Sequence, residues 1–122
     1  MKILIVDDSK AIHAFMKAIL AGTQAVLSHA FNGREAVDLV AAGNKFDVIL
    51  LDWEMLVLDG PGALVGIRAK DAAVPIVMVT SKNEIMDIQR ALEAGANEYV
   101  IKPFTKEILH EKISSVTGRE VA

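Results

Sequence analysis

The sequence lacks cysteine, and this absence excludes several kinds of chemistry. Without thiols the chain can form neither a disulfide framework nor a thiolate metal site, and it has no cysteine nucleophile. Any reactive groups must therefore be oxygen and nitrogen atoms. The cysteine count alone leaves the redox compartment unspecified.

An excess of basic residues and long apolar runs are also missing. The chain carries 13 Lys and Arg against 16 Asp and Glu, a formal net charge of −3, and these charges are scattered. No basic stripe is available to neutralise a nucleic-acid backbone, so we expect no direct contact with nucleic acid. No apolar run approaches the ~20 residues that span a bilayer, and the apolar start is too short for a secretory signal. We therefore expect a cytoplasmic protein without membrane contact.

The chain does contain enough hydrophobic side chains for one core. They make up 52% of the sequence, and 122 residues suit a single domain over residues 1–122. Four apolar runs are continuous, as in strands buried on both faces: 3–6, 48–51, 76–79 and 99–101. A fifth segment, 24–30, has a mixed pattern that fits a strand nearer the sheet edge.

Start and stop signals for helices lie between these strands. Two pairs have the spacing of a capping box, Asn32 with Glu35 and Ser81 with Glu84. The remaining signals are Asp8 or Ser9 as a cap, Pro61 in a first turn, Thr105 as a cap, and C-terminal glycines at 43 and 95. The alternation of five strands with five helices predicts an α/β fold with a parallel sheet and helices on both faces.

Polar residues follow four of the predicted strands. They are Asp7 and Asp8 after the first strand, Asp52 after the third, Thr80 and Ser81 after the fourth, and Lys102 and Pro103 after the fifth. Each alone has a simpler explanation as a turn former, a helix cap or a solvated charge. Ligands of an open α/β sheet, however, bind outside the carboxyl ends of its strands. The coincidence at four strand ends therefore predicts one shared site.

The three carboxylates imply a cation. At a few ångströms each pair repels by about 4 kcal/mol at an effective dielectric near 20, so a positive charge must lie among them. Oxygen ligands without histidine or cysteine suit a hard cation, and we expect Mg²⁺, or Mn²⁺ in its place. Such an ion can bridge Asp52 and an incoming phosphoryl group, with Lys102 and Thr80 holding other phosphoryl oxygens. Asp52 is then the expected nucleophile.

With these residues the whole chain resembles the receiver domain of two-component response regulators, in the style of the stand-alone chemotaxis regulators. The resemblance implies a flavodoxin-like, doubly wound (βα)5 fold with a five-stranded parallel sheet of order 2-1-3-4-5. It implies a phosphorylation-dependent signalling switch rather than an enzyme. The expected partners are a sensor histidine kinase or histidine phosphotransfer protein and a downstream protein target, and the expected state is a monomer or a phosphorylation-dependent dimer.

For the metal ion, the resemblance implies four contributing residues. Asp8 and Asp52 would bind Mg²⁺ directly, Asp7 would act mainly through water, and the backbone carbonyl of Glu54 would supply a further ligand.

For the phosphoryl group, the resemblance implies Asp52 as the acceptor, Thr80 as the switch hydroxyl and Lys102 as the counter-ion. Tyr99 would be an aromatic switch whose rotamer follows Thr80. The Lys102–Pro103 bond would be cis, against a base rate of about 5–6% for such bonds.

Two features depart from the family pattern. The family usually has Met-Pro, any residue, then Met-Asp-Gly after the acceptor, whereas this chain reads MLVLDG over residues 55–60. Leu56 replaces the proline, so the loop loses a fixed φ and gains freedom. Glu54 and Lys82, two residues beyond Asp52 and Thr80, are the second departure. Their charges can pair across the site mouth and screen an acyl phosphate from water or position that water, or both can point into solvent.

For several other residues the sequence predicts a location in the core, at the surface or at the rim of the site. We expect Phe15, Ile19 and Leu20 in the core, the three histidines 13, 29 and 110 at ordinary surface or partly buried positions, and Trp53 at the site rim. The family's donor-docking surface would include Lys10, Ile12, His13 and Lys17. Its output face, formed by the fourth helix, the fifth strand and the fifth helix, would include Ile88, Gln89, Leu92, Tyr99 and Lys106.

Two other functions remain open alternatives. One is a receiver that acts by protein contact without phosphorylation, although every acceptor, metal, hydroxyl and lysine position holds a competent residue. The other is an aspartyl-phosphate phosphatase, because Glu54 places a second carboxyl group two residues after Asp52. That class uses Asp at this position, and its pattern lacks the Asp7-Asp8 pair.

Overall fold

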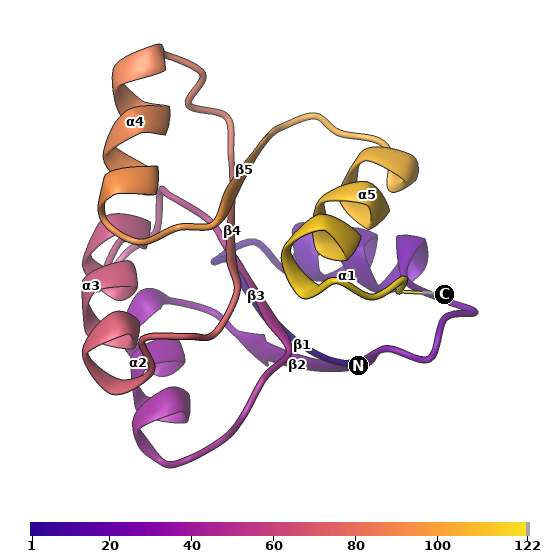
Figure 1. Ribbon diagram of the computed structural model, residues 1–122, viewed down its shortest axis with the longest axis horizontal. Coiled ribbons are helices and arrows are strands. Elements are labelled where there is room, and N and C mark those ends of the chain that lie inside the picture. Colours follow the sequence, from indigo (N-terminus) through magenta and orange to yellow (C-terminus); the bar gives the residue numbers. More distant parts are fainter. Residues whose placement is uncertain (122) are drawn as a thin grey trace.

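The predicted strand segments form one parallel sheet in the computed structural model, which describes residues 1–121 (Figure 1). The strands are β1 (Lys2–Val6), β2 (Val26–Ala30), β3 (Val48–Leu51), β4 (Ile76–Thr80) and β5 (Glu98–Ile101). Their order is β2-β1-β3-β4-β5, and every neighbouring pair is parallel. The doubly wound fold and its strand order are therefore confirmed.

Five helices alternate with the strands and cover both faces of the sheet. They are α1 (Lys10–Ile19), α2 (Gly33–Ala41), α3 (Gly60–Lys70), α4 (Ile85–Glu93) and α5 (Lys106–Thr117). Figure 1 shows α1 and α5 on one face and α2, α3 and α4 on the other. No helix within residues 1–121 is long and apolar enough to cross a membrane.

The continuous apolar runs are explained by burial on both sides of the sheet. All residues of β3 and β4 are buried. Within β1, Leu4 and Val6 belong to the core cluster under α2 and α3, whereas Ile3 and Ile5 belong to the cluster under α1 and α5. The edge strand β2 is less buried, and its Val26 is 60% exposed. Its mixed sequence pattern reflects that edge position.

Most predicted helix caps are present. The side chains of Ser9, Asn32 and Thr105 each accept a hydrogen bond from a backbone N–H in the first turn of α1, α2 and α5. Pro61 lies in the first turn of α3, and glycines with positive φ follow α2 and α4 at positions 43 and 95. These contacts satisfy N–H groups that have no partner within the helix.

The predicted capping box of Ser81 and Glu84 is wrong. Helix α4 begins at Ile85, with Glu84 at the cap position and no capping hydrogen bond from its side chain. The preceding segment is held as a loop, because the backbone N–H of Lys82 donates to the Thr80 hydroxyl and its carbonyl accepts from the Tyr99 hydroxyl. These bonds compete with an earlier helix start.

The core prediction for the first helix is partly wrong. Leu20 is buried and Ile19 partly buried, but Phe15 is 41% exposed and contacts the edge of the Phe104 ring. The buried positions of α1 are His13 and Met16, and Leu20 follows one turn later. This spacing of three and four residues defines the inward stripe of a helix, and Phe15 lies beside it.

Candidate functional site

Three carboxylates meet at the carboxyl edge of the sheet. Asp7 and Asp8 follow β1 and Asp52 follows β3, and these two strands are hydrogen-bonded neighbours. One oxygen from each of the three lies within 4.8 Å of the others. Asp7 and Asp52 are buried, whereas Asp8 is exposed. The prediction that these groups converge is confirmed, and an all-oxygen cluster suits a hard divalent cation.

Lys102 reaches this cluster from the end of β5. Its Nζ lies 2.9 Å from Asp7 Oδ2 and 3.2 Å from Asp52 Oδ1. The Lys102–Pro103 bond is cis, as expected, and the backbone N–H of Lys102 donates to the carbonyl of Thr80. The ammonium therefore supplies positive charge next to both buried carboxylates.

The pKa values of Asp52 and Lys102 reflect burial and mutual attraction. Burial raises the pKa of Asp52 to about 6, the charge of Asp7 adds to this, and Lys102 partly opposes it. Burial by itself lowers the pKa of Lys102, but its contacts with Asp7 and Asp52 outweigh that effect and the pKa is raised. At neutral pH the site therefore holds an ionised Asp52 and a charged Lys102.

Thr80 and Tyr99 are joined through one residue of the β4–α4 loop. Thr80 is 1% exposed at the end of β4, and its hydroxyl accepts the backbone N–H of Lys82 at 3.3 Å. Tyr99 on β5 is also buried, and its hydroxyl donates to the carbonyl of the same Lys82. Burial raises the pKa of Tyr99 to about 12, so the phenol stays protonated and remains a donor.

The charges of Glu54 and Lys82 pair, as the sequence allowed. Lys82 is partly exposed and Glu54 is exposed, and Lys82 Nζ lies 3.6 Å from Glu54 Oε1. The same ammonium lies 5.8 Å from the centroid of the Trp53 ring. The pair therefore connects the β3–α3 loop to the β4–α4 loop beside Asp52, and Trp53 lies at the rim as predicted.

Sequence reasoning missed the role of His13, which is buried at 5% exposure rather than at the surface or partly buried. Its Nε2 lies 2.7 Å from the carbonyl oxygen of Asp7 and must donate to it, while its Nδ1 lies 2.7 Å from Nδ1 of His29. The ring also stacks on Phe31. The signal in the sequence was a histidine on the apolar stripe of α1, five residues after Asp8. His13 holds the backbone of Asp7 and cannot belong to a docking surface.

Most other residues that we predicted on the docking surface and the output face are at least partly exposed. Lys10 and Lys17 are exposed and Ile12 is partly buried on α1. On the predicted output face, Gln89, Leu92 and Lys106 are exposed, whereas Tyr99 is buried and Ile88 packs against the core. His29 is exposed, and the partly buried His110 contacts the carbonyl of Ile19.

The loop without proline contains a strained residue that the sequence did not reveal. Val57 has φ +73°, in the left-handed region that β-branched residues rarely adopt. Val57 and Leu56 are 80% and 78% exposed, so packing does not compensate for that strain. Asp59 closes the loop by accepting the N–H of Gly62 at the start of α3. The loop is therefore stable at its end and strained in its middle.

The fold and the site together define a doubly wound α/β protein with a charged crevice at the point where strand order reverses. The model of the response regulator receiver domain matches residues 3–114, and the chain belongs to this family.

Relatives and solved structures agree with this assignment. A chemotaxis protein CheY homolog of Campylobacter jejuni is 38% identical over 122 residues, covering 97% of this chain and 93% of the relative. The chemotaxis protein CheY of Pseudomonas aeruginosa is 36% identical, with 98% of each chain covered. The receiver domain of the sensor histidine kinase PA1611 from P. aeruginosa is similar with a TM-score of 0.88 and 30% identity, covering 97% of this chain and 98% of that chain. Its crystal structure has a magnesium ion coordinated in the active-site cleft.

Replacing Val57 with glycine should stabilise the protein. Glycine adopts positive φ without the cost of about 1–2 kcal/mol that a left-handed side chain imposes, although it loses more entropy on folding. We expect the free energy of unfolding in urea to rise by about 1 kcal/mol. Leu56→Gly is the matched control, because Leu56 is equally exposed and has no positive φ. It should lower stability, and an equal loss in both variants would contradict the strain.

The raised pKa of Asp52 predicts a pH-dependent cost of folding. Between its ordinary pKa of 3.8 and about 6, the native protein binds this proton more tightly than the unfolded chain does. The free energy of unfolding therefore falls as pH rises through this window. In a chelating buffer, we expect Asp52→Asn to be more stable than wild type by roughly 1–3 kcal/mol at pH 8.

The difference between Asp52→Asn and wild type should disappear near pH 4, where the wild-type carboxyl is protonated in the native state. Urea unfolding at several pH values measures it. Asp38→Asn is the control, because Asp38 lies exposed in an ion pair with Arg34. A stability difference that does not change between pH 4 and pH 8 would rule out the buried carboxylate as its cause.

Proposed function

We propose that this protein is a phosphorylation-dependent signalling switch of a histidine–aspartate phosphorelay, with Asp52 as the phosphoacceptor. The observation that carries the proposal is the junction of Asp7, Asp8 and Asp52 with Lys102 at one sheet edge. Membership of the receiver family gives the same chemistry a precedent. The domain would act as an acceptor that assists its own phosphorylation and dephosphorylation, rather than as a conventional enzyme.

The carboxylate cluster fits a hard divalent cation, Mg²⁺ or Mn²⁺. Asp8 and Asp52 would contact the ion directly, Asp7 mainly through water, and Glu54 through its backbone carbonyl. Their donor atoms are all oxygens, and the carboxylates already lie within reach of one another. When bound, the ion supplies positive charge that offsets the negative charge of the carboxylates and phosphoryl oxygens.

Asp52 would perform the transfer as an ionised nucleophile. A carboxylate oxygen of Asp52 attacks the phosphorus of a phosphohistidine, a P–O bond forms, and the P–N bond to the departing imidazole breaks. A pKa of about 6 leaves this carboxyl ionised at neutral pH. Lys102, which lies 3.2 Å from Asp52, would hold one phosphoryl oxygen, and the Thr80 hydroxyl would donate to another.

The signal would leave the site through Lys82. If the Thr80 hydroxyl turns toward the phosphoryl group, it no longer accepts the N–H of Lys82. The β4–α4 loop can then move, and the carbonyl that accepts from Tyr99 moves with it. A change of the Tyr99 rotamer would alter the face formed by α4, β5 and α5.

The partners follow from this chemistry. A sensor histidine kinase or histidine phosphotransfer protein would donate the phosphoryl group at the active-site end, near α1. A downstream protein would bind the α4–β5–α5 face of a cytoplasmic monomer or of a phosphorylation-dependent dimer. Neither nucleic acid nor a membrane has a role in this proposal.

Intact-mass measurement after incubation with acetyl phosphate tests the proposal. We expect one added phosphoryl group on wild type in the presence of Mg²⁺, and none with a chelator or in Asp52→Asn, which lacks the nucleophile. Trp53 fluorescence would show separately whether Mg²⁺ binds. If wild type binds Mg²⁺ and still gains no phosphoryl group, a receiver that acts by protein contact alone becomes the better hypothesis.

Lys82→Met should shorten the life of the phosphorylated state. Its ion pair with Glu54 spans the mouth of the site, and we infer that it screens the acyl phosphate from water. Partly exposed pairs contribute below about 1 kcal/mol, so we expect dephosphorylation to accelerate roughly two- to fivefold. The decay of the phosphorylated mass with time measures the rate.

Lys112→Met is the control, because Lys112 is about as exposed as Lys82 and forms an ion pair with Glu98 away from the site. It should leave the rate unchanged. A slower decay in Lys82→Met would instead mean that the pair positions the attacking water.

A further inference from the structure

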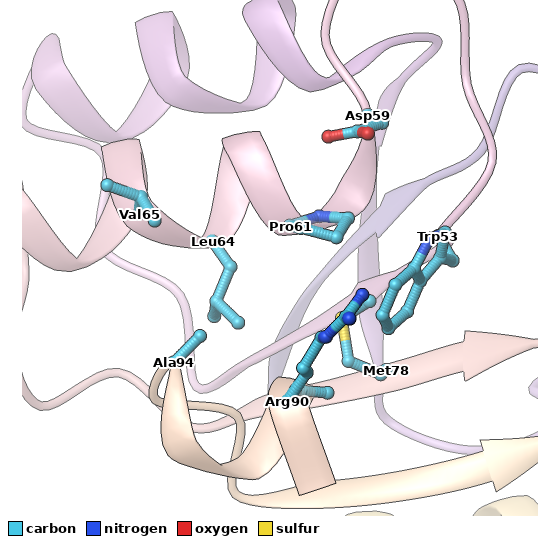
Figure 2. Close-up of a pocket in the computed structure, with 9 residues that line it drawn as sticks. Trp53, Asp59, Pro61, Leu64, Val65, Met78, Arg90 and Ala94 are labelled. Atoms are coloured by element: carbon cyan, nitrogen blue, oxygen red, sulfur yellow. The ribbon is translucent and has the colours of Figure 1, made fainter. Parts of the chain in front are cut away.

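A cavity of about 480 Å³ lies between α3 and α4, apart from the acidic crevice. Its lining is mainly apolar, and Figure 2 shows the side chains that surround it. Leu64, Met78 and Ala91 are buried and form its base, whereas Val65 is 64% exposed at its rim. The volume falls within the range of about 300–1,000 Å³ that is usual for small-molecule sites.

Small side chains on α4 leave this space open. Ala91 and Ala94 line the cavity from α4 and are three residues apart, so they lie on one side of the helix. Each presents only a methyl group, while Pro61 and Leu64 line the cavity from α3. At these two positions the α4 side chains are therefore too short to fill the space next to α3.

Arg90 provides a positive charge at the opening. It lies on α4 one residue before Ala91, and Figure 2 shows its side chain at the cavity beside Trp53. Arg90 forms no ion pair with any carboxylate in residues 1–121. Asp59 also lines the cavity as a negative charge, and its Oδ1 accepts the N–H of Gly62 as the cap of α3. The guanidinium of Arg90 therefore favours an anionic ligand group on the α4 side of the opening.

We propose that this cavity binds a small organic anion with an apolar body, such as an aromatic carboxylate or sulfonate. The apolar body would lie against Leu64, Met78 and Ala91, and the acid group would meet the guanidinium of Arg90. Trp53 is a wall of the cavity and directly follows Asp52, so a ligand would touch a residue next to the acidic crevice. The proposal does not depend on phosphorylation of Asp52.

Titration of the ¹⁵N-labelled, unphosphorylated protein with 1-anilinonaphthalene-8-sulfonate tests this site. This probe combines a flat apolar body with one negative charge. We expect saturable shifts of the amide signals of Leu64, Val65, Arg90, Ala91 and Ala94, with a dissociation constant on the order of 100 µM. Well-dispersed spectra at every point would show that the protein stays folded.

Two variants separate the apolar and charged contributions. Ala94→Leu places a larger side chain at an exposed position of the lining, and it should abolish binding. Arg90→Gln should weaken the probe about three- to tenfold but leave the uncharged analogue N-phenyl-1-naphthylamine unaffected. Arg34→Gln, which removes the same charge from exposed α2, is the control and should bind like wild type.

Three results would overturn the proposal. The first is the absence of saturable shifts in wild type, and the second is shifts confined to a region outside α3 and α4. The third is that Ala94→Leu and Arg90→Gln both bind the probe with the same affinity as wild type. None of these results bears on the phosphorylation of Asp52, which the mass measurement tests separately.

Discussion

The ammonium of Lys102 between Asp7 and Asp52 is the interaction on which the active-site end of this molecule depends. Two buried carboxylates close together repel by several kcal/mol unless a positive charge compensates them. Lys102 provides that charge from β5, 95 residues beyond Asp7 in the sequence. The parallel sheet makes this possible, because it brings the carboxyl ends of β1, β3, β4 and β5 to one edge. The buried apolar strands thus bring the charged groups together, and Lys102 offsets the repulsion that this arrangement creates between the carboxylates.

The sequence predicts most of the fold because its short apolar runs are compatible with only one kind of element, a strand buried on both faces. Residues 48–51 and 76–79 are too short for helices and too apolar for an exposed edge, and both are buried strands. The polar residues after the strands predicted the crevice, because the carboxyl ends of parallel strands meet at one edge of the sheet. Ser81 and Phe15 were mispredicted because their positions depend on contacts distant in sequence. The Tyr99 hydroxyl helps hold the loop after Ser81, and the facing stripe of α1 leaves Phe15 outside.

Details of the site that depend on backbone geometry were the hardest to predict. The sequence showed that Leu56 replaces proline, but no residue type in the loop indicated the left-handed conformation of Val57. His13 looked like an ordinary histidine, although its ring reaches the carbonyl of Asp7 from the buried side of α1. In both cases the residue type disagrees with its local environment, and for His13 the contacts with Asp7 and His29 explain why it is tolerated. Such local conflicts often lie at functional sites.

Lys82 is the residue through which the separate parts of the site are connected. Its backbone N–H bonds to Thr80, its carbonyl to Tyr99, and its side chain to Glu54. A movement of this one residue therefore affects a buried hydroxyl, a buried phenol and the ion pair at the site mouth together. No sequence motif reveals this, because two of the three contacts use the backbone. A switch needs an element whose equilibrium both ends influence, and in the proposed function the loop carrying Lys82 would be that element.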